Sequence, residues 1–359
     1  MASNNFTFSD GDVPVIDVHF HYFAPDILGP LKEFVIASPD ETEDAMAKLG
    51  TSAVIYSPVI WSRYGTDWPE TKWADLCRQI TDAQAAEVTR NPAGRGSFAP
   101  LPLPHIESTI AALQYAEEIC SPKPDGYAIT TSANNMYLAH ESFTPIWEEC
   151  NRRGVVLFVH PNETVMPPQL DTKVYGWQMI EYPTETARCL MYMVDQAIFT
   201  KYPNIKWIFS HNGGSFPFLY QRVVRTLTGS KLIGAGGVDS MNKQVDRIAA
   251  ENNGKTLQQI FGGGNVFIEC SQGTRSQQIC LQAMGISAEN LLTGSDWPFP
   301  GKADVRATVA EMRSPEDSGL YSTEEVAGIR AGNALKIMPR LRKAWADKGL
   351  IHHKTETGL

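Results

Sequence analysis

The chain has 359 residues, of which 43% are hydrophobic and 20% are charged, a composition typical of globular proteins. Its net charge of -9 and the lack of any run rich in Lys or Arg argue against binding to nucleic acid. No apolar stretch approaches the length of a membrane span, and the length allows either two medium-sized domains or one large α/β barrel.

The first twelve residues, MASNNFTFSDGD, form a short polar lead without the basic and apolar regions of a secretion signal. Six cysteines are scattered along the rest of the chain and form no CxxC pair. This pattern predicts free thiols in a reducing compartment. We therefore expect a cytoplasmic location.

Eight short apolar runs recur along the chain and have the length of β-strands. They cover residues 15–19, 52–58, 96–103, 126–132, 155–161, 205–211, 265–271 and 290–296. Helix-like stretches separate them, and Gly154 stands where the helix before the fifth strand should stop. Eight alternating units over this length predict a parallel (β/α)8 TIM barrel. We expect one barrel domain over residues 1–359, with a short N-terminal lead, inserted loops or helices and a C-terminal helical tail.

A doubly wound open sheet is the alternative architecture. When such a sheet binds a dinucleotide, a glycine-rich turn usually follows its first strand, whereas FHYFAPD follows the first strand here. Two long connections, 161–183 and 228–264, have the length of lids or interface elements.

The first strand carries two histidines in the stretch VIDVHFHYFAPD, residues 15–26. His19 and His21 are two positions apart, so both side chains project from the same face of a strand. Two neutral imidazoles on one face form half of a metal site. By itself the pair is a weak signal, because histidines that hydrogen-bond in a loop look the same in a sequence.

Other residues of the types that bind metals follow other predicted strands. His160 ends the fifth strand, His211 ends the sixth and Asp296 ends the eighth. In a (β/α)8 barrel all strands end at the face that carries the active site, so these residues and the first-strand pair should converge. Four histidines lack this placement, and we treat them as background: His105, His140, His352 and His353.

These motifs resemble those of the amidohydrolase superfamily, which has HxH on strand one, His on strands five and six, and Asp on strand eight. SHNGGSFPFLYQR (210–222) and LLTGSDWPF (291–299) resemble segments of its aminocarboxymuconate-semialdehyde decarboxylase group. FTPIWEECNRRGVVLFVHP (143–161) and NALKI (333–337) resemble the 6-methylsalicylate decarboxylase branch. The likeness covers roughly residues 13–345.

The resemblance implies a carbon–carbon lyase that removes carbon dioxide from a hydroxylated aromatic acid without oxidation and without an organic cofactor. Within the branch the expected reaction converts 6-methylsalicylate to 3-methylphenol, a step of secondary metabolism. Another hydroxybenzoate, a pyrimidine carboxylate or a muconate semialdehyde would offer a similar flat anion. A metal-dependent hydrolase such as a lactonase on the same scaffold is a further alternative, and so is a metal-bound scaffold without activity.

The resemblance also implies roles for particular residues. His19, His21, His160 and Asp296 would bind one divalent metal per subunit, Zn²⁺ first and Mn²⁺ as the alternative. A single ion is expected because the fourth strand ends in AITTSANNMY, which lacks the lysine that bridges two metals in many amidohydrolases. His211 would act as acid or base with Asp296 beside it.

Substrate contacts are expected from four further residues. By resemblance, Arg222 would reach into the neighbouring subunit's site and hold the negative charge of the substrate, which implies a homodimer, with a tetramer as the alternative. Phe299, Trp177 and Arg63 are candidate contacts to the ring or its charge. Each of these three could equally be a packing or surface residue.

Overall fold

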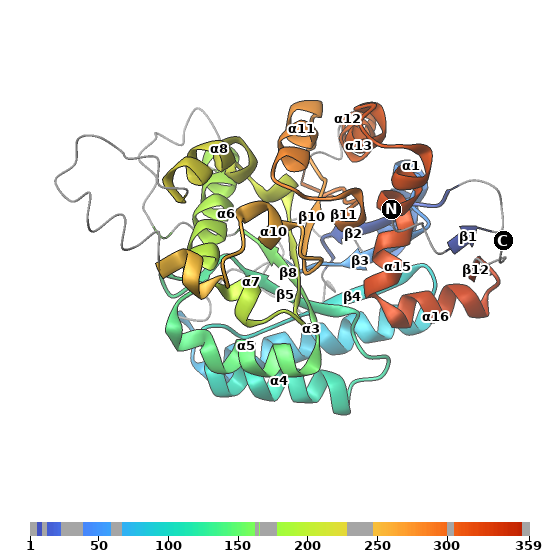
Figure 1. Cartoon of the computed structure of the whole chain (residues 1–359). Coiled ribbons are helices and arrows are strands. Elements are labelled where there is room, and N and C mark those ends of the chain that lie inside the picture. The colour runs from blue at the N-terminus through green and yellow to red at the C-terminus, as the bar shows by residue number, and fades with distance from the viewer. Residues whose placement is uncertain are drawn as a thin grey trace.

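The computed structural model describes residues 6–8, 13–22, 39–58, 67–161, 165, 178–227, 247–299 and 305–353, and Figure 1 shows their arrangement. Eight parallel strands form one sheet that curls into a nearly closed barrel, with helices around it. The strands follow one another around the barrel in chain order, which is the order of a (β/α)8 barrel. The predicted fold class is therefore confirmed.

Each of the eight predicted strands is present in the barrel. They are β2 (Ile16–Phe20), β3 (Ala53–Tyr56), β4 (Arg95–Pro100), β5 (Gly126–Thr130), β8 (Val156–His160), β9 (Lys206–Phe209), β10 (Val266–Glu269) and β11 (Leu291–Leu292). Seven of the eight strands are shorter than the apolar runs that predicted them, because those runs continue for one to four residues into the loop at the carboxyl end, whereas β2 has the length of its run, displaced by one residue.

The barrel closes between β2 and the segment that follows β11. The backbone N–H of Asp296 donates to the carbonyl of His19 at 2.8 Å, and that of His21 donates to the carbonyl of Trp297 at 2.8 Å. A parallel bridge joins Phe20 to Trp297. Closure therefore brings the residues around Asp296 beside the first-strand histidines, although about 275 positions separate them in the chain.

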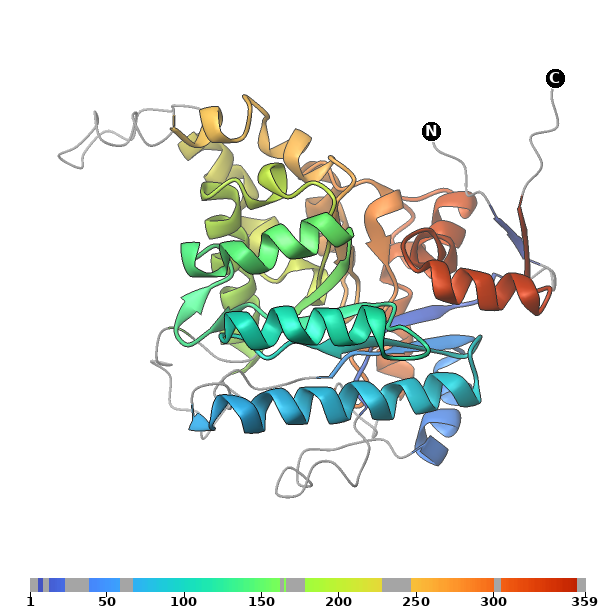
Figure 2. The same ribbon diagram turned by 90° about the horizontal axis from the view of Figure 1, so that it is seen from below.

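Helices cover the outside of the barrel. They are α1 (Pro39–Leu49), α3 (Glu70–Arg90), α4 (Ile106–Glu118), α5 (Thr144–Arg153), α6 (Gln178–Asp195), α7 (Ile198–Lys201), α8 (Phe216–Leu227), α10 (Leu257–Phe261), α11 (Arg275–Ala283), α12 (Val305–Met312), α13 (Ser314–Asp317), α14 (Thr323–Ala327), α15 (Asn333–Ile337) and α16 (Pro339–Asp347). In Figure 2, α3, α4 and α5 lie side by side on one flank. Gly154 ends α5 with φ 67°, as predicted, because the left-handed conformation suits glycine.

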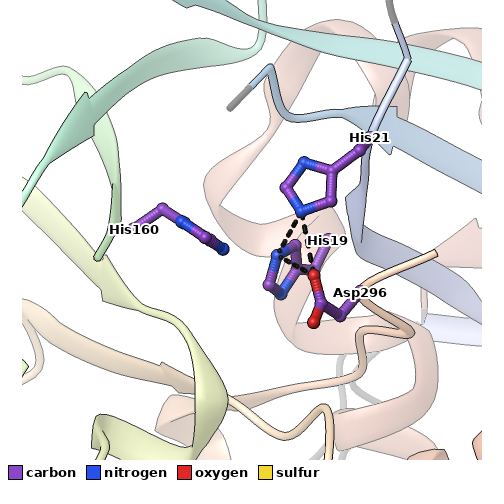
Figure 3. Close-up of side chains that lie close together, drawn as sticks. All are labelled: His19, His21, His160 and Asp296. Carbon is purple, nitrogen blue, oxygen red and sulfur yellow. Dashed lines mark hydrogen bonds and ion pairs between the residues drawn. The ribbon is translucent and has the colours of Figure 1, made fainter. Parts of the chain in front are cut away.

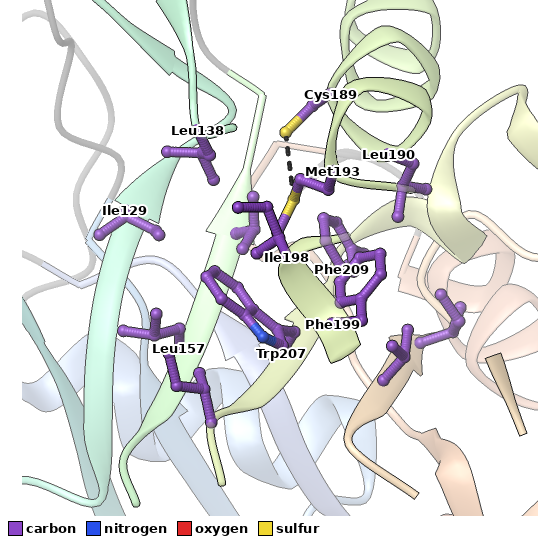
Figure 4. Packing of buried hydrophobic residues seen from close by; sticks show 14 of the residues in the cluster. Ile129, Leu138, Leu157, Cys189, Leu190, Met193, Ile198, Phe199, Trp207 and Phe209 are labelled. Carbon is purple, nitrogen blue, oxygen red and sulfur yellow. Dashed lines mark hydrogen bonds between the residues drawn. The ribbon is translucent and has the colours of Figure 1, made fainter. Parts of the chain in front are cut away.

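Side chains alternate between two apolar layers along each strand, and β8 illustrates this. Leu157 and Val159 point outward into the layer between the sheet and the helices, where they meet residues such as Trp207. Figure 4 shows part of this layer, in which α6 packs its apolar face against β9. Phe158 belongs to a second cluster, and its ring lies 5.0 Å from that of His19. The same period of two places His160 on the face of Phe158.

Two short strands pair the terminal segments of the described chain. β1 (Phe6–Phe8) and β12 (Ile351–His353) form an antiparallel ladder in which Phe6 lies opposite His353. The sequence predicts only a polar lead and a helical tail here. Three residues are too few for an alternating pattern to stand out, so this ladder escapes prediction from the sequence.

All six cysteines are free thiols, as predicted, and five of them are buried. Burial raises the pKa of the Cys77, Cys189 and Cys270 thiols, which keeps them protonated and poorly suited to nucleophilic catalysis. Among the helices that the structure describes, none is both long and apolar enough to cross a membrane.

Candidate metal centre

The four predicted metal ligands lie together at the carboxyl ends of the barrel strands (Figure 3). His19 lies in β2 and His21 directly follows it, His160 ends β8, and Asp296 follows β11. One ligand atom from each side chain lies within 4.8 Å of the other three, and all four residues are buried. Convergence of strand ends in a parallel barrel produces the cluster, as the sequence predicts.

Three of the four ligand atoms lie within hydrogen-bond distance of one another. Nε2 of His19 and Nε2 of His21 are 3.0 Å apart, and Oδ1 of Asp296 lies 3.1 Å from the first and 2.9 Å from the second. His160 approaches from the opposite side, as Figure 3 shows, with its ring 5.1 Å from that of His19. Neither ring nitrogen of His160 has a hydrogen-bond partner among the described residues, although the side chain is buried. A cation bound between the four ligand atoms would satisfy this otherwise unpaired imidazole.

Outer hydrogen bonds orient both His19 and His21. Nδ1 of His19 lies 2.7 Å from Oε2 of Glu269, and Nδ1 of His21 lies 2.6 Å from the carbonyl oxygen of Ser57. Both partners are acceptors, so each Nδ1 carries the proton and donates it. Each Nε2 would then offer its lone pair to a bound metal, the arrangement usual for histidines that bind metals.

Glu269 is a functional residue that sequence reasoning missed. It is the last residue of β10, the seventh strand of the barrel, and it is fully buried. The rule that found the other strand-end residues could have found this carboxylate too. Gly294 leaves room for it, because a Cβ at that position would lie 2.2 Å from Oε1 of Glu269.

The charges of the cluster suit a bound cation. Burial lowers the pKa of His160 and of His21, which keeps both imidazoles neutral and able to bind a metal. Burial alone would also lower the pKa of His19, but Glu269 and Asp296 together raise it to about 10. Without a metal, the two carboxylates therefore hold a proton on His19. A bound divalent ion would take over this positive charge and release the proton.

His211 lies beside the cluster but contacts a different oxygen of Asp296. It begins a 3₁₀ turn directly after β9 and has a left-handed backbone with φ 53°. Its Nε2 is 3.3 Å from Oδ2 of Asp296, and its ring lies 4.9 Å from that of His160. Its backbone N–H donates to Oε2 of Glu269 at 3.1 Å. Glu269 therefore contacts both His19 and the turn that positions His211.

The remaining predicted site residues are less close to the cluster. The ring of Phe299 lies 5.0 Å from that of His21 and is 47% exposed, so it borders the site. Arg222 lies on α8 and is exposed, rather than packed among the four ligands. Arg63 and Trp177 fall outside the described residues.

The profile of the amidohydrolase family matches residues 16–224 of this chain. The chain therefore belongs to this family, as its sequence motifs predict.

Among named relatives, the chain is 31% identical to the 6-methylsalicylic acid decarboxylase of Penicillium expansum, with 91% of this chain and 97% of that one covered. It is 32% identical to the 2-amino-3-carboxymuconate-6-semialdehyde decarboxylase of Dictyostelium discoideum over 42% of this chain and 41% of that one. The predicted resemblance to this group is confirmed. These relatives are carboxy-lyases, the enzyme class that the motifs predict.

Solved structures of similar fold include the apo form of Metarhizium anisopliae IDCase, with a TM-score of 0.77, 16% identity, and 93% of this chain and 99% of that one covered. A dihydroxybenzoic acid decarboxylase from Polaromonas sp. JS666 was solved with bound manganese and the inhibitor 2-nitroresorcinol. It matches with a TM-score of 0.68 and 18% identity, and 91% of this chain and 97% of that one are covered. At such identities the likeness establishes the barrel fold alone.

Proposed function

We propose that this protein is a metal-dependent, non-oxidative decarboxylase of a hydroxylated aromatic acid, with 6-methylsalicylate as the first candidate substrate and 3-methylphenol as its product. The observation that carries the proposal is the cluster of His19, His21, His160 and Asp296, with His211 beside it. Four buried ligand atoms with a separate titratable side chain next to them form the arrangement of a catalytic metal site. Similarity to a 6-methylsalicylic acid decarboxylase over nearly the whole chain supports the substrate class.

The proposed cofactor is one divalent metal ion per subunit. Three imidazoles and one carboxylate suit Zn²⁺, and manganese in the structurally similar Polaromonas enzyme makes Mn²⁺ the alternative. When bound, the ion would hold the carboxylate and the neighbouring hydroxyl of the acid and stabilise the negative charge of the phenolate. Strand β5 ends at Thr130 and is followed by Thr131, so no lysine is available there to bridge a second ion.

In the proposed reaction, His211 supplies the proton that replaces the carboxyl group. Protonation of the ring carbon that bears the carboxylate interrupts the aromatic system. The carbon–carbon bond to the carboxylate then breaks and carbon dioxide leaves. The electron pair of that bond returns to the ring and restores its aromaticity. His211 is suited to this step because its Nε2 faces the cluster at 3.3 Å from Oδ2 of Asp296, outside the set of four ligands. Phe299 would contact the ring of the acid from the border of the site.

A test of this function offers the protein a panel of acids and measures both carbon dioxide release and ultraviolet spectra. The panel contains 6-methylsalicylate, other hydroxybenzoates, a pyrimidine carboxylate and a lactone. We expect release of carbon dioxide from at least one hydroxybenzoate and a phenol as the other product. A new carboxylate from the lactone, without carbon dioxide from any acid, would instead identify a hydrolase.

We further propose that the active unit is a homodimer in which Arg222 contributes to the partner's site. Arg222 lies exposed on α8, one helical turn after Phe218, which is 54% exposed. α8 packs against α6, where Met179 and Ile180 are 71% and 53% exposed. A guanidinium next to exposed apolar side chains suits a surface that a second copy covers.

Replacement of Arg222 by Ala should lower kcat/KM on the order of 100-fold, as expected when a bidentate, charge-assisted contact is lost. Metal content should stay unchanged, because Arg222 is not one of the ligands. Mixed with inactive His211→Ala subunits, the Arg222→Ala protein should regain part of its activity, since each hybrid dimer has one site with both residues intact. If subunits demonstrably exchange and no activity returns, the site is not shared between subunits.

A further inference from the structure

Three successive barrel strands are followed by a non-glycine residue with left-handed backbone. His211 after β9 has φ 53°, Gln272 after β10 has φ 52°, and Asp296 after β11 has φ 58°. Such conformations are unfavourable for residues with a side chain, persist only where the surroundings hold them, and cluster at functional sites. His211 and Asp296 already belong to the proposed site. Gln272 has no role in the reaction described above.

The side chain of Gln272 reaches into the cluster, although the residue as a whole is exposed. Its amide Nε2 donates to Oδ2 of Asp296 at 2.6 Å. The two oxygens of Asp296 therefore have separate partners. Oδ1 faces the Nε2 atoms of His19 and His21, whereas Oδ2 faces Gln272 and His211.

The two donors to Oδ2 are unequal. The contact from Gln272 is 2.6 Å long, whereas that from His211 is 3.3 Å, beyond the usual range for an N–H···O hydrogen bond. Gln272 is therefore the principal partner of this oxygen. Because Gln272 makes the shorter contact to Oδ2, Asp296 holds the Nε2 of His211 only weakly, and this nitrogen remains available to a substrate.

A carboxylate without this contact would be less well oriented. The terminal torsion of an aspartate side chain is broad and roughly two-fold, so packing and hydrogen bonds decide where each oxygen points. An unrestrained Asp296 could turn away from the imidazoles, or offer Oδ2 fully to His211. A neutral amide donor prevents both movements and adds no charge that would compete with a metal.

We propose that Gln272 is a positioning residue for the metal site and, through Asp296, for His211. It hydrogen-bonds Oδ2 of Asp296, which keeps Oδ1 directed at the metal position. The same contact limits a closer hydrogen bond between Oδ2 and the Nε2 of His211. This inference rests on the proposed function, because it assumes that the cluster binds a divalent ion.

The experiment compares two variants, Gln272→Met and Gln272→Gly. Met keeps an unbranched side chain of similar length without the amide, and Gly removes the side chain while relieving the left-handed backbone. Both variants should fold, as near-ultraviolet circular dichroism of the metal-free protein would verify. The dissociation constant for Zn²⁺, measured by competition with a chromophoric chelator, should rise by about 10–100-fold in both, the usual effect of losing an outer partner of a metal ligand.

A matched control is Gln258→Met on α10. Gln258 is also exposed, and its amide Nε2 donates to the carbonyl of Ala283 rather than to the cluster. This variant should bind Zn²⁺ as tightly as the wild type. At saturating Zn²⁺, the Gln272 variants should have a lower kcat with a nearly unchanged KM, since His211 is then drawn toward Asp296.

The possible results separate the two proposals, because metal affinity is measured without any substrate. Wild-type binding of Zn²⁺ together with unchanged affinity in both Gln272 variants would overturn the role of Gln272 alone. A wild-type protein that binds neither Zn²⁺ nor Mn²⁺ would overturn the metal site and this inference with it. Weaker binding in the variants, with no decarboxylation of any acid by the wild type, would support Gln272 and reject the proposed reaction.

Discussion

Removal of the metal should abolish decarboxylation, and Asp296→Ala should produce the same loss without any chelator. Asp296 is the only carboxylate in the group of four ligands, and its Oδ1 lies within 3.1 Å of two imidazole nitrogens. Glu269 cannot take its place, because it already bonds Nδ1 of His19 and the backbone of His211. Without Asp296 the ion would lose one of four ligands and the only negative charge among them.

The measurement combines metal analysis with activity. Wild-type protein treated with a strong chelator should regain activity when Zn²⁺ or Mn²⁺ is restored, whereas Asp296→Ala should neither retain nor regain it. Asp347→Ala, an exposed residue of α16 that pairs with Lys343, is the control and should keep both metal and activity. Full turnover by a sample shown to be metal-free would refute the proposed mechanism.

Replacement of His211 by Ala should have the second large effect, a loss of decarboxylation by roughly 10²–10⁴-fold, the usual contribution of a positioned acid or base. The metal should remain bound, because His211 lies outside the group of four ligands and its hydrogen bond to that group goes to Oδ2 of Asp296, whereas Oδ1 faces His19 and His21. His211→Asn should be no better, because an amide can donate a hydrogen bond but cannot give up a proton at neutral pH.

Metal content, kcat and isotope incorporation check this prediction. In deuterated water, the wild-type product should carry deuterium at the carbon that lost the carboxyl group. His140→Ala is the matched control. His140 is exposed, and its side chain accepts a hydrogen bond from the backbone N–H of Ser142 at the start of a 3₁₀ turn, so its loss should leave activity intact. Loss of metal from His211→Ala would make His211 a ligand, and normal turnover would mean that the proton comes from another group.

The sequence by itself determined the architecture and the positions of the four residues expected to bind a metal. Apolar runs at regular intervals predict the eight strands because a buried parallel strand must be apolar on both faces. Because side chains two positions apart in a strand share a face, His160 lies on the face of Phe158 in β8, and the HxH motif places His19 and His21 together. Since all parallel strands of a barrel end at one face, these local patterns suffice to predict a cluster.

Only the tertiary structure decided how that cluster is supported. Glu269 bonds His19 across 250 positions, and Gln272 bonds Asp296 from the neighbouring strand end. The position of Glu269 at a strand end is visible in the sequence, but the partner that each of these two side chains bonds is not. Both depend on how far the barrel strands extend before they end, on the space that Gly294 leaves, and on the left-handed turns after three strands.

The β1–β12 ladder likewise required the structure, because two three-residue strands acquire their order only by meeting each other. The fold thus depends on hydrophobic burial, and the apolar pattern that drives this burial is visible in the sequence. Hydrogen bonds between side chains depend on distances of a few tenths of an ångström between residues far apart in the chain. Closure of the barrel sets those distances, and the sequence alone does not reveal them.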